Sequence, residues 1–165
     1  MYLLFNNYKK IIINFFIVIL LLIFQMYFPS IVTSEDFLLI KFDFILIYLV
    51  YLSFNYRIYL IICFAFFIGL FQDLLVQPST IGLFSFLKVL FVYFIGYLKD
   101  SNNIWSLQFK YFFITFLLFI HNSLYHYIFI NEFNFYALIY IFLESLMNLI
   151  LIILIDRLIF TKKVF

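Results

Sequence analysis

The chain has 165 residues, of which 68% are hydrophobic and only 11% are charged, with a net charge of +2. Soluble domains are about 45–50% apolar and about 25% charged, so the composition excludes a water-soluble domain and predicts an integral membrane protein. The single cysteine, Cys63, excludes an intramolecular disulfide and a metal site built from cysteines alone.

The apolar residues form six segments that reach or approach the length of about 20 residues that a helix needs to cross a bilayer. The first is too long for a signal-peptide core and lacks a small-residue cleavage site, so we expect a retained anchor. Because lipid forbids exposed strands, all six should be helices. We therefore predict one all-α domain over residues 1–165, an integral membrane bundle of six transmembrane helices. The expected spans are 11–28, 37–54, 59–76, 81–98, 107–130 and 135–160.

The charged residues between these segments predict the orientation of the bundle. Basic residues occur at the N-terminus, in the even-numbered connections and at the C-terminus. In the odd-numbered connections, all the charged residues are acidic. By the positive-inside rule, both termini should be cytoplasmic in a multi-pass protein. The basic residues are Lys9, Lys10, Arg57, Lys99, Lys110, Arg157, Lys162 and Lys163, and the acidic residues are Glu35, Asp36, Asp73 and Glu132.

One stretch carries most of the residues with special backbone chemistry. Gly69, Asp73, Pro78 and Gly82 lie within fourteen residues, where two apolar helices should meet in a short turn. We expect Asp73 to cap or orient the turn through backbone N–H groups. Gly69 should allow a close helix approach, and Gly82 should adopt a turn conformation closed to other residues.

Polar residues at membrane depth form a second candidate site. Counted at about 1.5 Å per residue, they all lie in the outer half of the bundle. Two interpretations remain open, namely pairing between helices and an outward-facing polar pocket. Lys88 is expected to pair with Glu144 or Asp43, because an unpaired buried charge is costly. The residues of this predicted layer are Asp43, Lys88, His121, Asn122, His126 and Glu144.

The sequence contains no pattern typical of an enzyme. His121 and His126 are five residues apart, so their side chains should point about 140° apart on a helix, unlike the two-histidine face of a metalloprotease. There is no Gly-x-Ser-x-Gly motif, Walker loop or basic surface for nucleic acid. We expect neither catalytic residues nor a metal or other cofactor.

The stretch from Gly69 to Gly82, with the two predicted helices that meet there as a hairpin, resembles the rod shape-determining protein MreD family. The matching residues are Gly69-x-x-x-Asp73, a short turn, Gly82 and a helix that carries Leu87 and Tyr97.

The start of the second segment, Phe42-Asp43 followed by a leucine-rich run, is similar to a Pro-Asp motif of that family, with Phe42 in place of the proline. The resemblance covers nearly the whole chain. It implies a non-enzymatic scaffold of the bacterial cell-elongation machinery in the cytoplasmic membrane, which helps to maintain rod shape and to organise lateral peptidoglycan synthesis. Its implied partners are an MreC-like protein, MreB filaments and the peptidoglycan synthases.

The family is also similar to the substrate-binding subunits of energy-coupling-factor vitamin transporters, which are six-helix bundles with an outward pocket. Uptake of a small molecule is therefore the alternative function, and the outward polar layer favours it. Segment 11–28 contains no alanine or glycine, although such subunits use small residues in their first helix to dock onto the transporter. A third interpretation, a lipid-handling or lipid-sensing protein, would use the same pocket.

Overall fold

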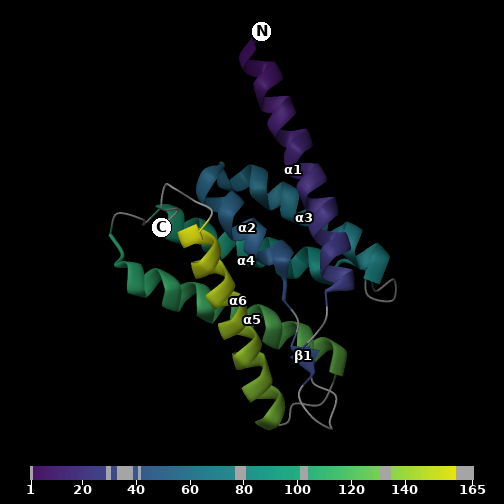
Figure 1. Ribbon diagram of the computed structural model, residues 1–165, viewed down its shortest axis with the longest axis vertical. Coiled ribbons are helices and arrows are strands. Elements are labelled where there is room, and N and C mark those ends of the chain that lie inside the picture. The colour runs from purple at the N-terminus through teal and green to yellow at the C-terminus, as the bar shows by residue number, and fades with distance from the viewer. Residues whose placement is uncertain are drawn as a thin grey trace.

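The computed structural model of the protein describes residues 2–28, 31–32, 39–40, 42–76, 81–100, 104–130 and 135–158. Its architecture is all-α, as predicted, with one short ribbon of two strands between the first two helices (Figure 1). The strands β1 (Ile31–Val32) and β2 (Leu39–Ile40) are antiparallel and pair Ile31 with Ile40 and Val32 with Leu39. The helices are α1 (Tyr2–Tyr27), α2 (Phe44–Asn55), α3 (Ile58–Val76), α4 (Leu83–Asp100), α5 (Leu107–Ile130) and α6 (Phe135–Leu158).

The second helix is shorter than the predicted span 37–54. It begins at Phe44, because the carboxylate of Asp43 accepts the backbone N–H of Leu46 at 3.0 Å and so caps the helix. Residues 39–40, which the apolar pattern placed inside the helix, are extended and paired in β2. The 12 residues of α2 span only about 18 Å, which is less than the predicted segment, and residues 37–38 and 41 of that segment lie outside the described residues.

Helix α2 lies between two hydrophobic clusters and is buried on almost every side. One cluster joins it to α4, α5 and α6, around Leu46, Val50 and Phe91. The other joins it to α1, α3 and α4, around Ile45, Leu49 and Ile68. A helix that is apolar on all faces is typical of a position inside a bundle, and α2 is the central element here.

The other helices are arranged around α2 (Figure 1). Helices α3 and α4 form a hairpin with the most extensive helix packing in the molecule, and α5 packs on both α4 and α6. Helix α1 packs mainly on α2 at one edge of the molecule. The hairpin and the α5–α6 pair thus position the two groups of residues singled out in the sequence.

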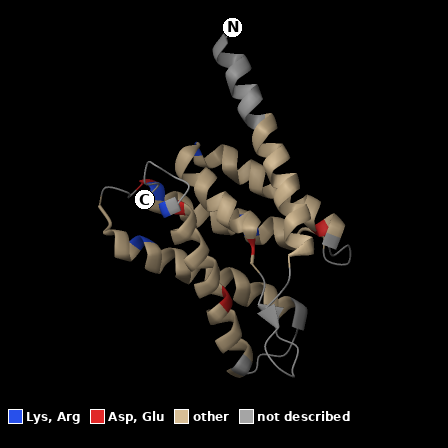
Figure 2. Cartoon of the chain, viewed as in Figure 1, with Lys and Arg blue, Asp and Glu red and all other residues tan. Residues whose placement is uncertain are grey.

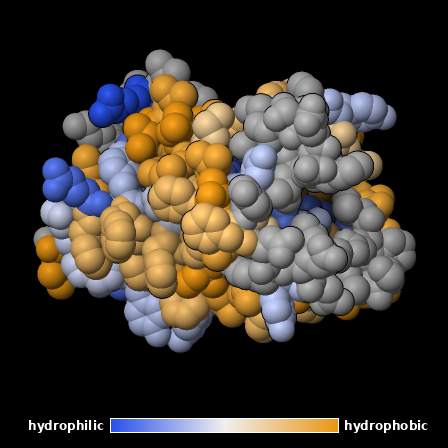
Figure 3. All heavy atoms as spheres, turned by 90° about the horizontal axis from the view of Figure 1, so that it is seen from below, coloured by the Kyte–Doolittle hydropathy of each residue, from blue (hydrophilic) through white to orange (hydrophobic). Residues whose placement is uncertain are grey.

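Apolar side chains are widely exposed on the described helices. Phe16, Leu20, Phe67 and Phe112 are each about two-thirds exposed, and hydrophobic residues cover much of the face seen in Figure 3. Two helical stretches, Ile58–Leu75 and Ala137–Arg157, are long and apolar enough to cross a bilayer. Large contiguous apolar surfaces mark interaction with a membrane or a protein, and together with these two helices they indicate association with a membrane.

Candidate functional site

The carboxylate of Asp73 joins the end of α3 to the start of α4. The first backbone N–H groups of a helix have no partner within the helix, and Gly82, just before α4, has no side chain to cap them. Asp73 supplies the missing acceptors from the neighbouring helix. Its Oδ2 accepts the N–H of Gly82 at 2.9 Å, and its Oδ1 accepts the N–H of Phe84 at 2.9 Å. Asp73 is fully buried, and the predicted capping role is confirmed.

Ser85 completes the cap, although the sequence analysis did not single it out. Its hydroxyl donates to Oδ2 of Asp73 at 3.2 Å, and its backbone N–H lies 3.4 Å from the same oxygen. The available signal was a small polar residue three positions after Gly82, where a bulkier side chain would be expected on an apolar helix. Four donors therefore converge on one buried carboxylate and satisfy its need for hydrogen bonds.

The two glycines of the hairpin have distinct roles, and both agree with the sequence-based expectation. A Cβ atom placed on Gly69 would lie 2.3 Å from the Cα of Ser85, so only glycine allows this approach of α3 to α4. Gly82 has a φ of 100°, a conformation that residues with a Cβ rarely adopt. Pro78 and the predicted turn 77–80 lie outside the described residues.

Lys88 is paired with Asp43, one of its two expected partners. Its side chain is fully buried, and Nζ lies 3.8 Å from Oδ2 of Asp43 and 5.1 Å from the centre of the Phe84 ring. The backbone N–H of Asp43 donates to Oδ1 of Asn148 at 3.1 Å. Asp43 thus caps α2 and at the same time connects it to Lys88 on α4 and to Asn148 on α6.

Glu144, the other expected partner of Lys88, lies beside a histidine instead. Its Oε2 is 3.5 Å from Nε2 of His126, and both side chains are partly buried. Asn122 on α5 lies 3.5 Å from the hydroxyl of Ser145 on α6. The buried ring of His121 meets Phe91 edge-on, with 5.9 Å between the ring centres.

These residues form what we call the polar cluster, at the N-terminus of α2 and on α4, α5 and α6. Contacts connect its members other than His121 in pairs across the helices, and His121 on α5 contacts Phe91 on α4, so pairing between helices is present. An outward-facing pocket stays a prediction. The members of the polar cluster are Asp43, Lys88, His121, Asn122, His126, Glu144, Ser145 and Asn148.

The chemistry that these side chains support is hydrogen bonding and charge pairing. Within the described residues, no group of three or more histidine, cysteine, aspartate or glutamate side chains is placed to hold a metal ion. His121 and His126 contact different neighbours, Phe91 and Glu144, and Cys63 is an exposed free thiol. The arrangement is that of a structural hairpin beside a buried polar interior.

The chain matches no protein-family model, and no curated protein or solved structure is significantly similar to it.

Proposed function

We propose that this protein is a non-enzymatic, multi-pass scaffold in the bacterial cytoplasmic membrane. In this proposal it acts in cell elongation as MreD-like proteins do and organises lateral peptidoglycan synthesis with an MreC-like partner. The observation that supports the proposal is the α3–α4 hairpin. Gly69, Asp73 and Gly82, the residues that carry the resemblance, each have a specific role in its geometry. A hairpin fixed by a buried carboxylate is a rigid surface for a partner helix.

The distribution of charge supports six crossings with cytoplasmic termini. Figure 2 shows most of the described Lys and Arg residues on the side where α4 ends, α5 begins and α6 ends. Arg57 lies between α2 and α3 and donates to the hydroxyl of Tyr59 at 3.2 Å, which raises the pKa of its guanidinium. Arginine is always charged in proteins, so Arg57 can contribute to the positive-inside orientation. The 19 residues of α3 cover about 28 Å, close to the hydrocarbon thickness.

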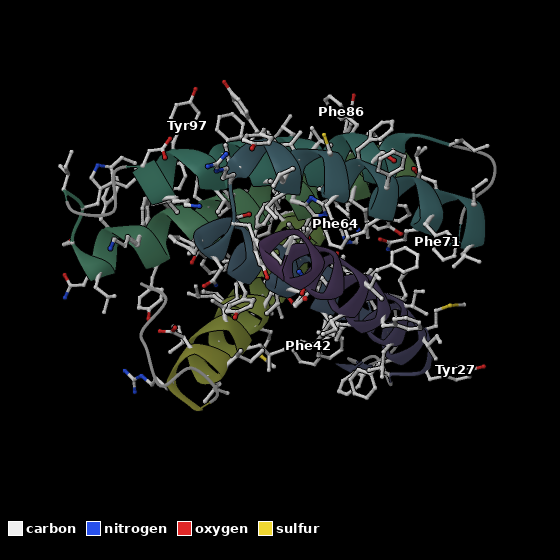
Figure 4. The ribbon with its side chains drawn as sticks, turned by 90° about the horizontal axis from the view of Figure 1, so that it is seen from above. Tyr27, Phe42, Phe64, Phe71, Phe86 and Tyr97 are labelled. Carbon is white, nitrogen blue, oxygen red and sulfur yellow. The ribbon has the colours of Figure 1, made fainter. Side chains whose placement is uncertain are left out.

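Partners of such a chain would bind to helix faces, because its connections are short. Figure 4 shows Phe86 and Tyr97 on α4 pointing away from the bundle, and both are more than half exposed. Aromatic residues are enriched in protein interfaces as well as at membrane boundaries. We propose that the face of α4 that carries Phe86 and Tyr97 and points away from the bundle contacts the MreC-like partner.

An affinity purification from the native membrane in detergent tests the assignment. Recovery of a protein with one membrane anchor and a large extracytoplasmic domain, together with peptidoglycan synthases, is the expected result. Recovery of a coupling subunit with two ATPases would overturn it. The unpartnered groups of the polar cluster favour this second candidate, in which the protein binds the substrate of a small-molecule uptake transporter.

Complementation of cell shape tests the role of the hairpin in the proposed function. In cells whose rod shape depends on this gene, Asp73→Ala should lower complementation although the protein still inserts into the membrane. Asp100→Ala, at the exposed end of α4, is the matched control and should complement fully. Full activity of a well-expressed Asp73→Ala protein would remove the hairpin from the proposed function.

A further inference from the structure

Three buried polar atoms of the polar cluster have no hydrogen-bond partner in the described part of the chain. They are Nζ of Lys88, Nδ1 of His121 and Nδ2 of Asn148, on α4, α5 and α6 respectively. These side chains are 0%, 6% and 1% exposed. A buried polar group without a partner costs about 1–3 kcal/mol, and a charged one costs more. Each of these three groups therefore needs a partner that the described side chains do not supply.

The geometry of the ion pair indicates what this partner is. Nζ of Lys88 lies 3.8 Å from Oδ2 of Asp43, which is within ion-pair range but beyond a hydrogen bond. A polar contact longer than about 3.5 Å is commonly bridged by water. The ammonium and the Asn148 amide supply donors that need an oxygen acceptor, whereas the carboxylate supplies an acceptor. A water molecule can satisfy both sides because it donates and accepts.

The polar cluster continues from these buried atoms to partly exposed side chains. Glu144 lies one helical turn from Asn148 on α6 and therefore on the same face. It pairs with His126, and these two side chains are 16% and 17% exposed. Nδ1 of His126 and the hydroxyl of Ser123 are again buried atoms without a partner in the described chain. Polar groups without a partner therefore occur from Lys88 towards the C-terminal end of α5 and the N-terminal end of α6. The proposed topology places these two helix ends on the outer side of the membrane.

Extended backbone contacts α6, the helix that carries Glu144 and Asn148. Strand β2 (Leu39–Ile40) contacts α6 and precedes Asp43, which is followed by α2. Non-helical backbone at membrane depth is tolerated where it is buried in protein or lines a water-filled cavity. Ionisable residues within a membrane bundle likewise face the bundle interior or such a cavity.

We propose that the polar cluster is a hydrated inlet that opens to the outer aqueous phase beside Glu144 and His126 and ends at Lys88. Its ligand is water, held by Lys88, His121 and Asn148, and one water bridges Lys88 to Asp43. Buried waters commonly make about three hydrogen bonds to groups that would otherwise be unsatisfied. The proposal rests on the membrane topology of the proposed function and adds to it a solvent-accessible site inside the bundle.

Cysteine accessibility in sealed vesicles tests the inlet. With Cys63 replaced by serine, single cysteines are placed at Asn148 and Ser145 inside the inlet, and at Ile150 on the exposed side of α6 as the matched control. Silver ions are applied from one side, and the thiols left unmodified are counted with a maleimide after denaturation. Since thiolate formation requires water, Asn148→Cys should react on the order of tenfold faster than Ile150→Cys. Ser145→Cys, a near-isosteric change, should follow Asn148→Cys.

Two exposed positions test the topology separately. Phe135→Cys lies at the start of α6 and Ile104→Cys between α4 and α5, and both side chains are largely exposed. The proposed orientation requires Phe135→Cys to react from outside and Ile104→Cys from inside. The reverse pattern would overturn the topology of the proposed function. Equal reaction rates of Asn148→Cys, Ser145→Cys and Ile150→Cys from both sides, in vesicles where Phe135→Cys reacts, would overturn the inlet alone.

Discussion

Gly69 and Ser85 pack backbone against backbone. The position that a Cβ of residue 69 would occupy is 2.3 Å from the Cα of Ser85 and 2.5 Å from its backbone nitrogen. Neither atom can move away without shifting α4 itself. The same residue, Ser85, donates its hydroxyl to Asp73, so the close approach and the helix cap depend on one another.

Substitution of Gly69 by alanine should therefore force the hairpin apart. We expect a loss of about 1–3 kcal/mol in the free energy of unfolding, the usual cost of overpacking, measured by denaturant titration in mixed micelles. Gly96→Ala is the matched control, because the three atoms nearest to its Cβ would all belong to the side chain of Ile58, the closest at 2.8 Å. Rotation of Ile58 can relieve that contact, so Gly96→Ala should cost less. An equal loss at both positions would contradict the backbone argument.

Substitution of Asp73 by asparagine tests the cap. The amide keeps one acceptor oxygen, but its NH2 group replaces Oδ1 or Oδ2 and faces backbone donors. We expect a loss of about 1–3 kcal/mol for the unsatisfied buried groups. Asp100→Asn, an exposed change at the end of α4, should stay within about 0.5 kcal/mol of the wild type. Stability of Asp73→Asn equal to that of Asp100→Asn would show that the carboxylate is not needed.

Gly82→Ala separates backbone strain from packing. A Cβ at this position would meet no atom within 4 Å, whereas φ is +100°. The expected loss of about 1–2 kcal/mol thus comes from the conformation alone. Asparagine tolerates positive φ better than alanine, so Gly82→Asn should be the milder change in the same titration. Wild-type stability of Gly82→Ala would mean that the turn relaxes to another conformation.

The hairpin could be predicted from the sequence because its chemistry is local. A carboxylate or a glycine in an otherwise apolar helix has few structural explanations, and the roles expected for Gly69, Asp73 and Gly82 agree with the structure. The presence of six helices also followed from the apolar segments. Ser85 was missed because a single serine in a helix is common, so its position three residues after Gly82 was a weak signal.

The start of α2 could not be predicted, for a physical reason. Residues 37–43 are apolar enough to continue a helix, and hydropathy does not distinguish extended from helical chain. Only the pairing of Leu39–Ile40 with β1 and the cap by Asp43 fix the boundary. The choice between Asp43 and Glu144 as the partner of Lys88 depends on helix packing, which sequence spacing does not encode. The number of membrane crossings stays a prediction.

The partner of Lys88 can be tested by comparing two double-mutant cycles. Lys88→Met leaves Asp43 without its counter-charge, and removal of one member of a buried pair costs about 3–5 kcal/mol. Asp43→Asn removes the charge but keeps an N-cap oxygen for the N–H of Leu46. The double variant should therefore lose less than the sum of the two, with a coupling of about 0.5–3 kcal/mol.

The matched cycle uses Glu144→Gln with the same Lys88→Met change. Glu144 lies beside His126, and its side chain is partly exposed, so its coupling to Lys88 should be close to zero. Unfolding titrations of the three single and two double variants against the wild type decide between the two partners. A larger coupling to Glu144 than to Asp43 would mean that the pair at the N-terminus of α2 does not hold Lys88 inside the bundle. Coupling to Asp43 alone would identify the Lys88–Asp43 pair as the electrostatic link between α2 and the hairpin.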